Sequence, residues 1–494
     1  MKKAAIVGAG IGGIAASIRL ALKGYQVTVY EANESFGGKM HEFWLGGYRF
    51  DAGPSLFTLP RLVDELFELA GRKPADYFTY TRLNPITHYF WPDGSHLKAY
   101  ADPEKFAQEA AQQLGVPEQD VREVLARSRR LYRGTADTFL NKSLHKAGTY
   151  LSPDILKALG CLTDLGLTTT MHQANANKFK DPRFVQLLDR FATYNGSDPY
   201  QAPGTLNIIP HLEHNIGAFY PKGGMYAIAA SLVKLAEELC VEFRYREPVE
   251  QIVTLAGKVM SVKTAQDNYN ADVVVSNMDV VPTYRKLLAD HPAPEKTLKQ
   301  PRSSSALIYY WGIRKQFPEL HLHNIFFSAD YREEFEQIFQ RKTISSDPTI
   351  YVNITSKLEP EDAPAGSENW FVMVNVPHHQ GQDWQKLIAT TRETVLQKLS
   401  SMLHTNIEEL IEQEQVLDPL LIESRTSSFA GALYGSSSNN MMAAFLRHPN
   451  FSSQIDGLYF CGGSVHPGGG VPLCLLSAKI VGELVPDVAP AEKV

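Results

Sequence analysis

The stretch AAIVGAGIGGIAASIRLALKGYQVTVYEANESFGGKM, residues 4–40, decides the fold of this 494-residue chain. It begins with a short apolar run that meets the glycine-rich turn Gly8-x-Gly10-x-x-Gly13. A helical pattern of apolar residues follows, and a second strand pattern ends on Glu31. Strand, glycine turn, helix, strand and acid in this order are typical of a dinucleotide-binding βαβ unit.

Each glycine of this turn has its own physical role. Gly8 permits the tight turn out of the first strand, Gly10 lets the backbone approach a pyrophosphate, and Gly13 lets helix and strand pack closely. The helix N-terminus offers free N–H groups and the positive end of its dipole to phosphates. The carboxylate of Glu31 can accept hydrogen bonds from both hydroxyls of a ribose.

A second tight turn, Gly37-Gly38-Lys39, follows Glu31 after five further residues. A turn with a cation at this place fits a cofactor that extends further across the domain, and it favours FAD over NAD. The arrangement resembles the flavoprotein superfamily of amine oxidases, protoporphyrinogen oxidases and carotenoid desaturases. That superfamily usually has Arg at the position of Lys39, and Lys supplies a point charge in place of a bidentate fork.

Composition and charge exclude several other classes of protein. Hydrophobic residues make up 44% and charged residues 21% of the chain, which is normal for a soluble globular protein, and the length predicts two or three domains. The net charge of -6 gives no reason to expect a nucleic-acid partner. The cysteines are scattered without a Cys-x-x-Cys pair, so we expect a reducing compartment, no disulfide framework and no metal site. They are Cys161, Cys240, Cys461 and Cys474.

The N-terminus imitates a signal peptide, because two lysines precede an apolar stretch. Glycines interrupt that stretch, and Arg19 and Lys23 lie within it, so we expect no signal peptide. No window approaches the roughly 18 apolar residues that a spanning helix requires. We therefore expect a cytoplasmic protein.

Beyond residue 40 the pattern changes several times. A hairpin is expected before DAGPS, residues 51–55, whose Gly–Pro turn either brings amides near the flavin or is an ordinary loop. The alternating residues 77–100 predict another hairpin, in which Tyr89, Phe90 and Trp91 are interpreted as sheet core more readily than as a ligand wall. The pattern from 102 to 212 is helical.

The turn, helix and strand pattern of residues 4–40 returns after residue 219. It predicts a helix at 227–239 and strands at 241–244, 248–252 and 272–276. Mixed strand and helix patterns then extend to about residue 420. They include predicted strands at 306–311, 348–354 and 370–376 and predicted helices at 384–402 and 407–414. Near the C-terminus a strand ends on Gly462-Gly463, and the glycine-rich run SVHPGGGVP leads into a last helix. Its free amides suit a flavin that needs support at two places.

Together with the opening stretch, YPKGG at 220–224, VPH at 376–378 and HPGGGVP at 466–472 resemble the bacterial carotenoid desaturases of the phytoene desaturase type. The resemblance covers nearly the whole chain, and HPGGGVP is its most specific piece. The stretches YGSSSN at 434–439 and AFLRHP at 444–449 are similar to a sub-branch, the hydroxycarotenoid 3,4-desaturases.

This resemblance implies an α/β fold. A Rossmann-like FAD-binding domain of the glutathione reductase or amine oxidase type would carry an inserted mixed-sheet substrate domain and a helical domain able to face a membrane. The expected division is 1–76, 215–300 and 435–494 for the FAD-binding domain, 77–101 and 301–434 for the substrate domain, and 102–214 for the helical domain.

The resemblance also implies which residues line the FAD. They are Gly8, Gly10, Gly12, Gly13, Glu31, Gly38, Lys39, Gly53, Pro54, Ser55, Val249, Asn277, Gly463, Ser464, Gly470, Val471 and Pro472. Val249 would contribute backbone contacts at the adenine end.

The implied reaction inserts a double bond into a membrane-held carotene or hydroxycarotene by hydride transfer to the flavin. Conjugation stabilises the developing allylic cation, so a strong base is not required, and the sequence identifies no catalytic residue. Asp154, Glu213 and His214 are interpreted as surface or cap residues. His466 is interpreted as fixing its loop by a hydrogen bond, with proton transfer as the alternative.

A substrate of this kind is a long apolar polyene, so the enzyme must touch the bilayer peripherally without spanning it. Leu151, Ile155, Leu159 and Leu162 fall on one helical face and either form an interfacial patch or pack into a core. By resemblance the electron acceptor is oxygen or a quinone. The alternative functions are a carotenoid isomerase, an oxygenase that makes terminal aldehydes, another amine-oxidase-like flavoenzyme, or a non-enzymatic prenyl- or lipid-binding protein on the same fold.

Overall fold

The computed structural model describes residues 1–151, 153–161, 166, 168–440 and 447–488. The helices are α1 (Ile11–Leu22), α2 (Arg61–Leu69), α3 (Pro103–Leu114), α4 (Glu118–Phe139), α5 (Ala147–Tyr150), α6 (Asp154–Gly160), α7 (Met171–Lys178), α8 (Pro182–Asp189), α9 (Tyr226–Glu238), α10 (Val280–Pro282), α11 (Glu295–Leu298), α12 (Tyr331–Glu336), α13 (Trp384–Met402), α14 (Pro419–Thr426) and α16 (Val471–Leu484).

The strands form two larger sheets and several small ones. They are β1 (Lys3–Val7), β2 (Gln26–Tyr30), β3 (Glu42–Leu45), β4 (Tyr48–Asp51), β5 (Phe57–Thr58), β6 (Tyr80–Arg82), β7 (Thr87–Phe90), β8 (His96–Ala99), β9 (Ala218–Pro221), β10 (Glu242–Arg244), β11 (Val249–Leu255), β12 (Lys258–Thr264), β13 (Asn268–Asn270), β14 (Val273–Ser276), β15 (Ser305–Ile313), β16 (His323–Phe326), β17 (Ile350–Ile354), β18 (Glu368–Val376), β19 (Ile411–Leu417) and β20 (Leu458–Phe460).

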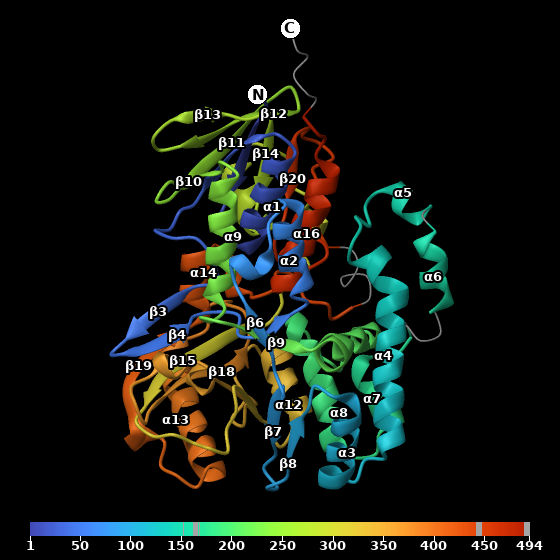
Figure 1. Cartoon of the computed structure of the whole chain (residues 1–494), viewed down its shortest axis with the longest axis vertical. Coiled ribbons are helices and arrows are strands. Elements are labelled where there is room, and N and C mark those ends of the chain that lie inside the picture. Colours follow the sequence, from blue (N-terminus) through green and yellow to red (C-terminus); the bar gives the residue numbers. More distant parts are fainter. Residues whose placement is uncertain (152, 162–165, 167, 441–446, 489–494) are drawn as a thin grey trace.

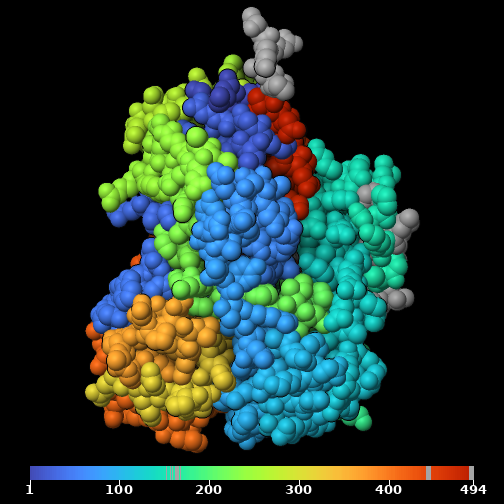
Figure 2. Space-filling view, in the orientation of Figure 1, coloured from blue at the N-terminus to red at the C-terminus, as the bar shows by residue number. Residues whose placement is uncertain are grey.

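A five-stranded parallel sheet, in the order β10-β2-β1-β14-β20, unites three remote parts of the chain. Its central strands β1 and β14 are short and mostly apolar, as expected where both faces of a parallel sheet are covered. Helices α1, α9 and α16 cover one face, and the antiparallel strands β11, β12 and β13 contribute to the core on the other. Figure 2 shows the N-terminal, middle and C-terminal segments side by side at the top of the molecule.

The second large sheet is mixed and has seven strands, in the order β19-β15-β18-β17-β16-β7-β8. It lies at the opposite end of the molecule from the N-terminus and helix α16 (Figure 1). Alternate residues of its central strands, such as Leu307 and Trp311 on β15 and Val372 on β18, form a core with helix α13. The residues between them face the other way, and they become important at the site.

Helices α3, α4, α7 and α8 lie together beside the β7–β8 hairpin (Figure 1). They share a core with the hairpin residues Tyr89 and Trp91, so the interpretation of these two aromatics as core is confirmed. The helices that the structure describes are all too short or too polar to cross a bilayer. Leu151 is 86% exposed, whereas Leu162 and the segment 444–446 of the similar stretch AFLRHP lie outside the described residues.

The fold class predicted from the sequence is confirmed, and one expected element is wrong. Residues 407–414 were expected as a helix, but only a short 3-10 turn forms there, and Ile411–Leu417 is the edge strand β19. It pairs antiparallel with β15. The sequence IEQEQVL is compatible with either a strand or a helix. It forms a strand because it pairs with the hydrogen-bonding edge of β15.

Candidate functional site

A single cavity of about 1500 Å³ is lined from both large sheets. One end of the cavity lies at the carboxyl ends of β1, β2 and β14. Open α/β sheets bind their ligands at this edge. The predicted FAD residues come together here, and all of them except Gly13 line the cavity. Contact between these residues and FAD itself stays a prediction.

The glycine turn has the backbone that the motif requires. Gly8 adopts a φ of 95°, and Gly10 is the N-cap of α1, with no side chain capping the helix. A Cβ on Gly10 would lie 2.7 Å from Asn277 Nδ2, so only glycine leaves this approach open. A Cβ on Gly13 would lie 2.1 Å from the Gly8 carbonyl oxygen, which explains why Gly13 serves helix–strand packing and does not reach the cavity.

Glu31 lies at the end of β2 and is only 5% exposed. One carboxylate oxygen accepts a hydrogen bond from the Ala9 backbone N–H at 2.7 Å, and the other accepts from the Asn33 backbone at 2.9 Å. The glycine turn and the acid are therefore joined directly. The carboxylate retains lone pairs for a ligand, since each oxygen can accept more than one hydrogen bond.

Lys39 is half-buried and places its ammonium group on the cavity wall. Its Nζ donates to the Leu433 carbonyl at 2.8 Å, and no carboxylate of the described residues lies within ion-pair distance. Burial lowers the pKa of Lys39, and Asp279 offsets this only in part. An ammonium group has three donors, so an anionic ligand could use those that remain.

The second glycine-rich run forms the start of α16. Gly470 is the N-cap, has a φ of 104° and receives no side-chain cap, and a Cβ there would meet nothing within 4 Å. The N–H groups of this helix start are consequently left for a ligand, as they are at α1. Gly463, Ser464, Val471 and Pro472 line the same part of the cavity.

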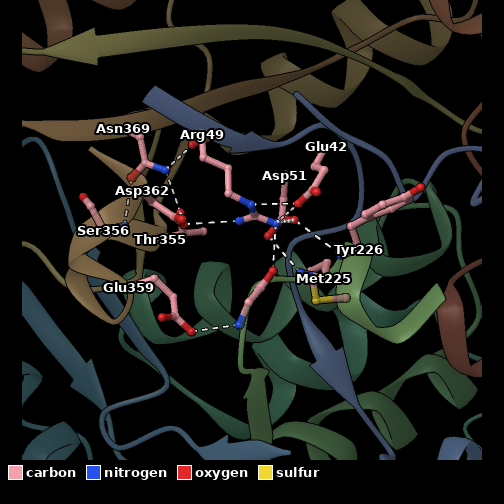
Figure 3. Close-up of polar contacts among 11 residues, drawn as sticks. Glu42, Arg49, Asp51, Met225, Tyr226, Thr355, Ser356, Glu359, Asp362 and Asn369 are labelled. Carbon is pink, nitrogen blue, oxygen red and sulfur yellow. Dashed lines mark hydrogen bonds and ion pairs between the residues drawn. The ribbon is translucent and has the colours of Figure 1, made fainter. Parts of the chain in front are cut away.

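The loop that carries Gly53, Pro54 and Ser55 is anchored by a buried ion cluster centred on Arg49 (Figure 3). The guanidinium group contacts Glu42 at 2.5 Å, Asp51 at 2.9 Å and Asp362 at 3.2 Å. The carboxylate of Asp51 also accepts from the backbone N–H groups of Met225 and Tyr226, at the start of α9. The cluster thus ties the loop to both sheet systems.

One face of the seven-stranded sheet forms the far wall of the cavity. Its apolar members are Ala306 and Ile308 of β15, Ile325 of β16, and Phe371 and Met373 of β18. Because side chains alternate along a strand, these residues lie opposite the ones that pack against α13. This wall could not be predicted from the sequence, since strands buried on both faces show no polar alternation.

Polar residues missed from the sequence also line this part of the cavity. Tyr351 donates to His323 Nδ1 at 2.7 Å and shares a hydrogen bond of 2.8 Å with Ser55 Oγ. Nearby, Arg190 forms a buried ion pair with Glu213 at 3.2 Å, and Tyr194 donates to the same carboxylate. No local motif announces these residues, because sheet pairing and the helical part bring them together.

The interpretation of Glu213 and His214 as surface or cap residues is wrong, because they are 1% and 0% exposed. Burial alone would raise the pKa of Glu213, but Arg190 and other neighbours outweigh it and the pKa is lowered. Glu213 is therefore a carboxylate committed to its ion pair and a poor base. Asp154 instead pairs with two lysines, Lys142 at 2.7 Å and Lys157 at 3.0 Å.

His466 acts on its loop as expected, since its Nε2 shares a hydrogen bond of 2.9 Å with the Lys142 carbonyl. All four cysteines are free thiols.

The residues present fit a flavin dinucleotide by the chemistry of their donors. Two uncapped helix starts and the ammonium group of Lys39 suit a pyrophosphate and the carbonyl edge of a flavin, and a buried carboxylate suits a ribose. The far wall is mostly apolar, with Tyr351, His323, Arg190 and Tyr194 as polar members, so the cavity combines a polar compartment with a largely apolar one.

Comparisons with known proteins agree with this geometry. The chain is 53% identical to the 1-hydroxycarotenoid 3,4-desaturase of Flavobacterium sp. (strain P99-3), over 99% of both chains. It is 36% identical to the 4,4'-diapolycopene oxygenase of Methylomonas sp. (96% of both) and 33% identical to the 4,4'-diaponeurosporene oxygenase of Staphylococcus aureus (97% of both).

Solved structures share the fold at low sequence identity. An oxidoreductase from Methanosarcina mazei has a TM-score of 0.65 at 15% identity, over 97% of this chain and 100% of its own. Putrescine oxidase has a TM-score of 0.63 at 13% identity, over 98% of both chains. The family model described as flavin containing amine oxidoreductase matches residues 11–485. The chain belongs to the flavin containing amine oxidoreductase family, and it is a flavin oxidoreductase.

Proposed function

We propose that this chain is an FAD-dependent carotenoid desaturase of carotenoid biosynthesis, which inserts a double bond near the hydroxylated end of a polyene. The observation that carries this proposal is the 53% identity to a 1-hydroxycarotenoid 3,4-desaturase, because it extends over 99% of both chains. A cavity with one polar and one apolar compartment supports it, since both a dinucleotide and a hydrocarbon chain must be held.

In this proposal the predicted FAD residues hold the cofactor. The N-termini of α1 and α16 and the ammonium group of Lys39 bind anionic and carbonyl groups, while Glu31 binds the ribose. Val249 and the loop 53–55 complete the enclosure. The chemistry that bound FAD supplies is acceptance of the hydride that leaves an allylic carbon.

The apolar wall of the seven-stranded sheet orients the polyene and excludes water. Excluding water protects a developing allylic cation, which the conjugated chain itself stabilises. Glu213 is held in its ion pair with Arg190, so we assign no base to the proton that leaves the neighbouring carbon. The electron acceptor that regenerates the flavin is oxygen or a quinone.

We also propose the division into an FAD-binding, a substrate and a helical domain at the boundaries expected from the sequence. The sheet order supports it, because the parallel sheet draws its strands from the three segments assigned to the FAD-binding domain. The helical domain would touch the membrane peripherally. The exposure of Tyr150 (49%) and Leu151 (86%) on that domain supports this contact.

A carotenoid oxygenase is the second candidate, because two relatives at 36% and 33% identity are named as oxygenases. Both reactions begin at a C–H bond of a polyene end. They differ in whether the product contains a new double bond or a new oxygen atom.

The deciding experiment is expression of the chain in a host that makes defined carotenes and 1-hydroxycarotenes, followed by absorbance and mass spectra of the products. Desaturation predicts a red shift and a loss of two hydrogens, whereas oxygenation predicts a gain of oxygen. An unchanged chromophore length with altered geometry would instead identify an isomerase. Purified protein should be yellow, and a colourless protein that takes up no FAD would remove all of the enzyme proposals.

A further inference from the structure

Where the cofactor compartment meets the apolar wall, Ser55, Tyr351 and His323 form a continuous hydrogen-bonded relay. All three residues line the cavity; Ser55 and Tyr351 are half-buried, and His323 is 1% exposed. The oxygen atoms of Ser55 and Tyr351 are 2.8 Å apart, and the Tyr351 oxygen lies 2.7 Å from His323 Nδ1. Polar groups in a compartment for hydrocarbon cost binding energy unless a ligand uses them.

The direction of the relay follows from Asn353. Its Nδ2 donates both to the Leu322 carbonyl at 3.1 Å and to His323 Nδ1 at 3.1 Å. The carbonyl fixes the orientation of the amide, so Nδ1 faces an N–H group and must be an acceptor. Burial lowers the pKa of His323 to about 4, and the ring is therefore neutral at pH 7.

Because Nδ1 accepts, the hydroxyl of Tyr351 donates to it. The oxygen of Tyr351 then accepts from the hydroxyl of Ser55, which uses the only hydrogen on Ser55 Oγ. The lone pairs of Ser55 Oγ stay available on the cavity side. The open end of the relay therefore accepts a hydrogen bond and selects a ligand that donates one.

The position of Ser55 matches the chemistry of a 1-hydroxy end group. The loop 53–55 lies against the basic turn, since a Cβ on Gly53 would sit 1.8 Å from the Lys39 carbonyl oxygen. Ser55 thus stands where the cofactor compartment meets the apolar wall. In a 1-hydroxycarotenoid a single carbon separates the hydroxyl-bearing carbon from the 3,4 bond. A group that binds this hydroxyl must consequently lie beside the reacting edge of the flavin.

We propose that Ser55, held by Tyr351 and His323, is the receptor for the substrate hydroxyl and determines specificity for hydroxylated polyenes. This inference rests on the proposed desaturase function. Tyr351 and His323 act as positioning residues, because their hydrogen bonds hold the Ser55 hydroxyl in the orientation that accepts from the ligand.

The test compares kcat/KM for a 1-hydroxycarotene, its 1-methoxy ether and the same carotene without the oxygen. Wild-type enzyme should prefer the hydroxylated substrate, and the ether should behave like the plain carotene because it cannot donate. Ser55→Ala should reduce kcat/KM for the hydroxylated substrate about tenfold to a hundredfold, so that the preference collapses. Tyr351→Phe should reduce the preference less, since it frees the Ser55 hydroxyl to rotate.

Tyr309→Phe is the matched control. Tyr309 is likewise a sheet tyrosine whose hydroxyl is hydrogen-bonded, to the Ile388 carbonyl at 2.7 Å, but it is buried, faces α13 and does not line the cavity. Its replacement should leave the preference intact. Bound FAD per chain is measured for every variant, so a loss of cofactor is not mistaken for a loss of recognition.

Several results would overturn the inference. One is a wild-type enzyme that acts equally on hydroxylated and plain carotenes. Another is an equal loss on both substrates in Ser55→Ala and Tyr351→Phe, which would indicate a structural role. Failure of the proposed function is recognised separately, because the wild-type chain would then desaturate none of the three substrates.

Discussion

Arg49 and Asp51 stand two residues apart on β4, and the guanidinium group of Arg49 donates to the Asp51 carboxylate at 2.9 Å. Both side chains are less than a tenth exposed (7% and 4%). Since Asp51 also holds the start of α9 and leads into the loop 53–55, this pair connects the ion cluster to the cofactor compartment.

Replacing Arg49 with Met should therefore destabilise the whole fold. Asp51 and Asp362 would remain buried without their cation, and the expected loss is about 3–5 kcal/mol of unfolding free energy. Urea denaturation measures it. Arg61→Met removes an exposed ion pair with Glu68 and should leave the urea midpoint unchanged.

The same variant should have a characteristic pH dependence. Burial raises the pKa of Asp51, and Arg49 is the main influence that lowers it again. Without Arg49 the folded-state pKa of Asp51 rises further. The variant's deficit in unfolding free energy, relative to wild type, is therefore full at pH values above that pKa. It shrinks as the pH falls through that pKa, because Asp51 then takes up a proton. A deficit that does not shrink as the pH is lowered from 8 to the onset of acid unfolding would show that the lost charge is not the cause.

Glu31→Gln should weaken FAD binding without unfolding the chain. The amide oxygen can still accept from the Ala9 N–H, but the charge that strengthens bonds to the ribose hydroxyls is lost. We expect a rise of about tenfold in the Kd of FAD, measured by titrating apoprotein and following flavin fluorescence. Glu242→Gln, on the exposed neighbouring strand β10, serves as control and should bind FAD like wild type.

Much of the cofactor compartment could be predicted because glycine spacing encodes backbone geometry directly. Gly8, Gly10 and Gly470 lie where the motifs place them. Their backbone conformations can be predicted from the local sequence alone, without knowledge of distant contacts. His323 and Tyr351 could not be predicted, since they meet only through the pairing of β16 with β17. The burial of Glu213 likewise depends on Arg190, which a separate helical segment supplies.

Replacing Gly13 or Gly10 of the first turn by Ala should have different effects, on apoprotein stability and on FAD affinity respectively. A Cβ on Gly13 would lie 2.1 Å from a backbone oxygen that cannot rotate away, so Gly13→Ala should destabilise even the apoprotein by about 1–3 kcal/mol or more. In Gly10→Ala the obstacle is the end of the Asn277 side chain, which can move into the cavity. That variant should keep its apoprotein stability and lose FAD affinity.

Urea denaturation of apoprotein and FAD titration separate these outcomes. Gly148→Ala is the control, because a Cβ there meets nothing within 4 Å. If Gly13→Ala and Gly10→Ala proved equally stable as apoproteins, the assignment of Gly13 to helix–strand packing would be wrong.

Buried histidines should make the folded chain sensitive to acid. His448 is 3% exposed, with Nδ1 donating to the Pro449 carbonyl at 2.7 Å and Nε2 facing the Tyr284 hydroxyl at 3.1 Å. Burial lowers its pKa from 6.5 to about 4. The pKa is lowered in the same direction by burial at His88, His211, His214, His323, His378 and His466.

A histidine with a depressed folded-state pKa contributes its full stability above the unfolded pKa of 6.5 and loses it as the pH falls towards about 4. At about 1.4 kcal/mol for each pKa unit, one such residue is worth about 3 kcal/mol over this range. Urea midpoints between pH 8 and pH 4.5 should therefore fall steeply below pH 6.5. His448→Gln should lower the midpoint at pH 8 but flatten the decline, because the amide takes up no proton, whereas replacing the surface residue His404 should leave the profile as it is. A decline in His448→Gln parallel to that of wild type would exclude His448 as a source of the acid sensitivity.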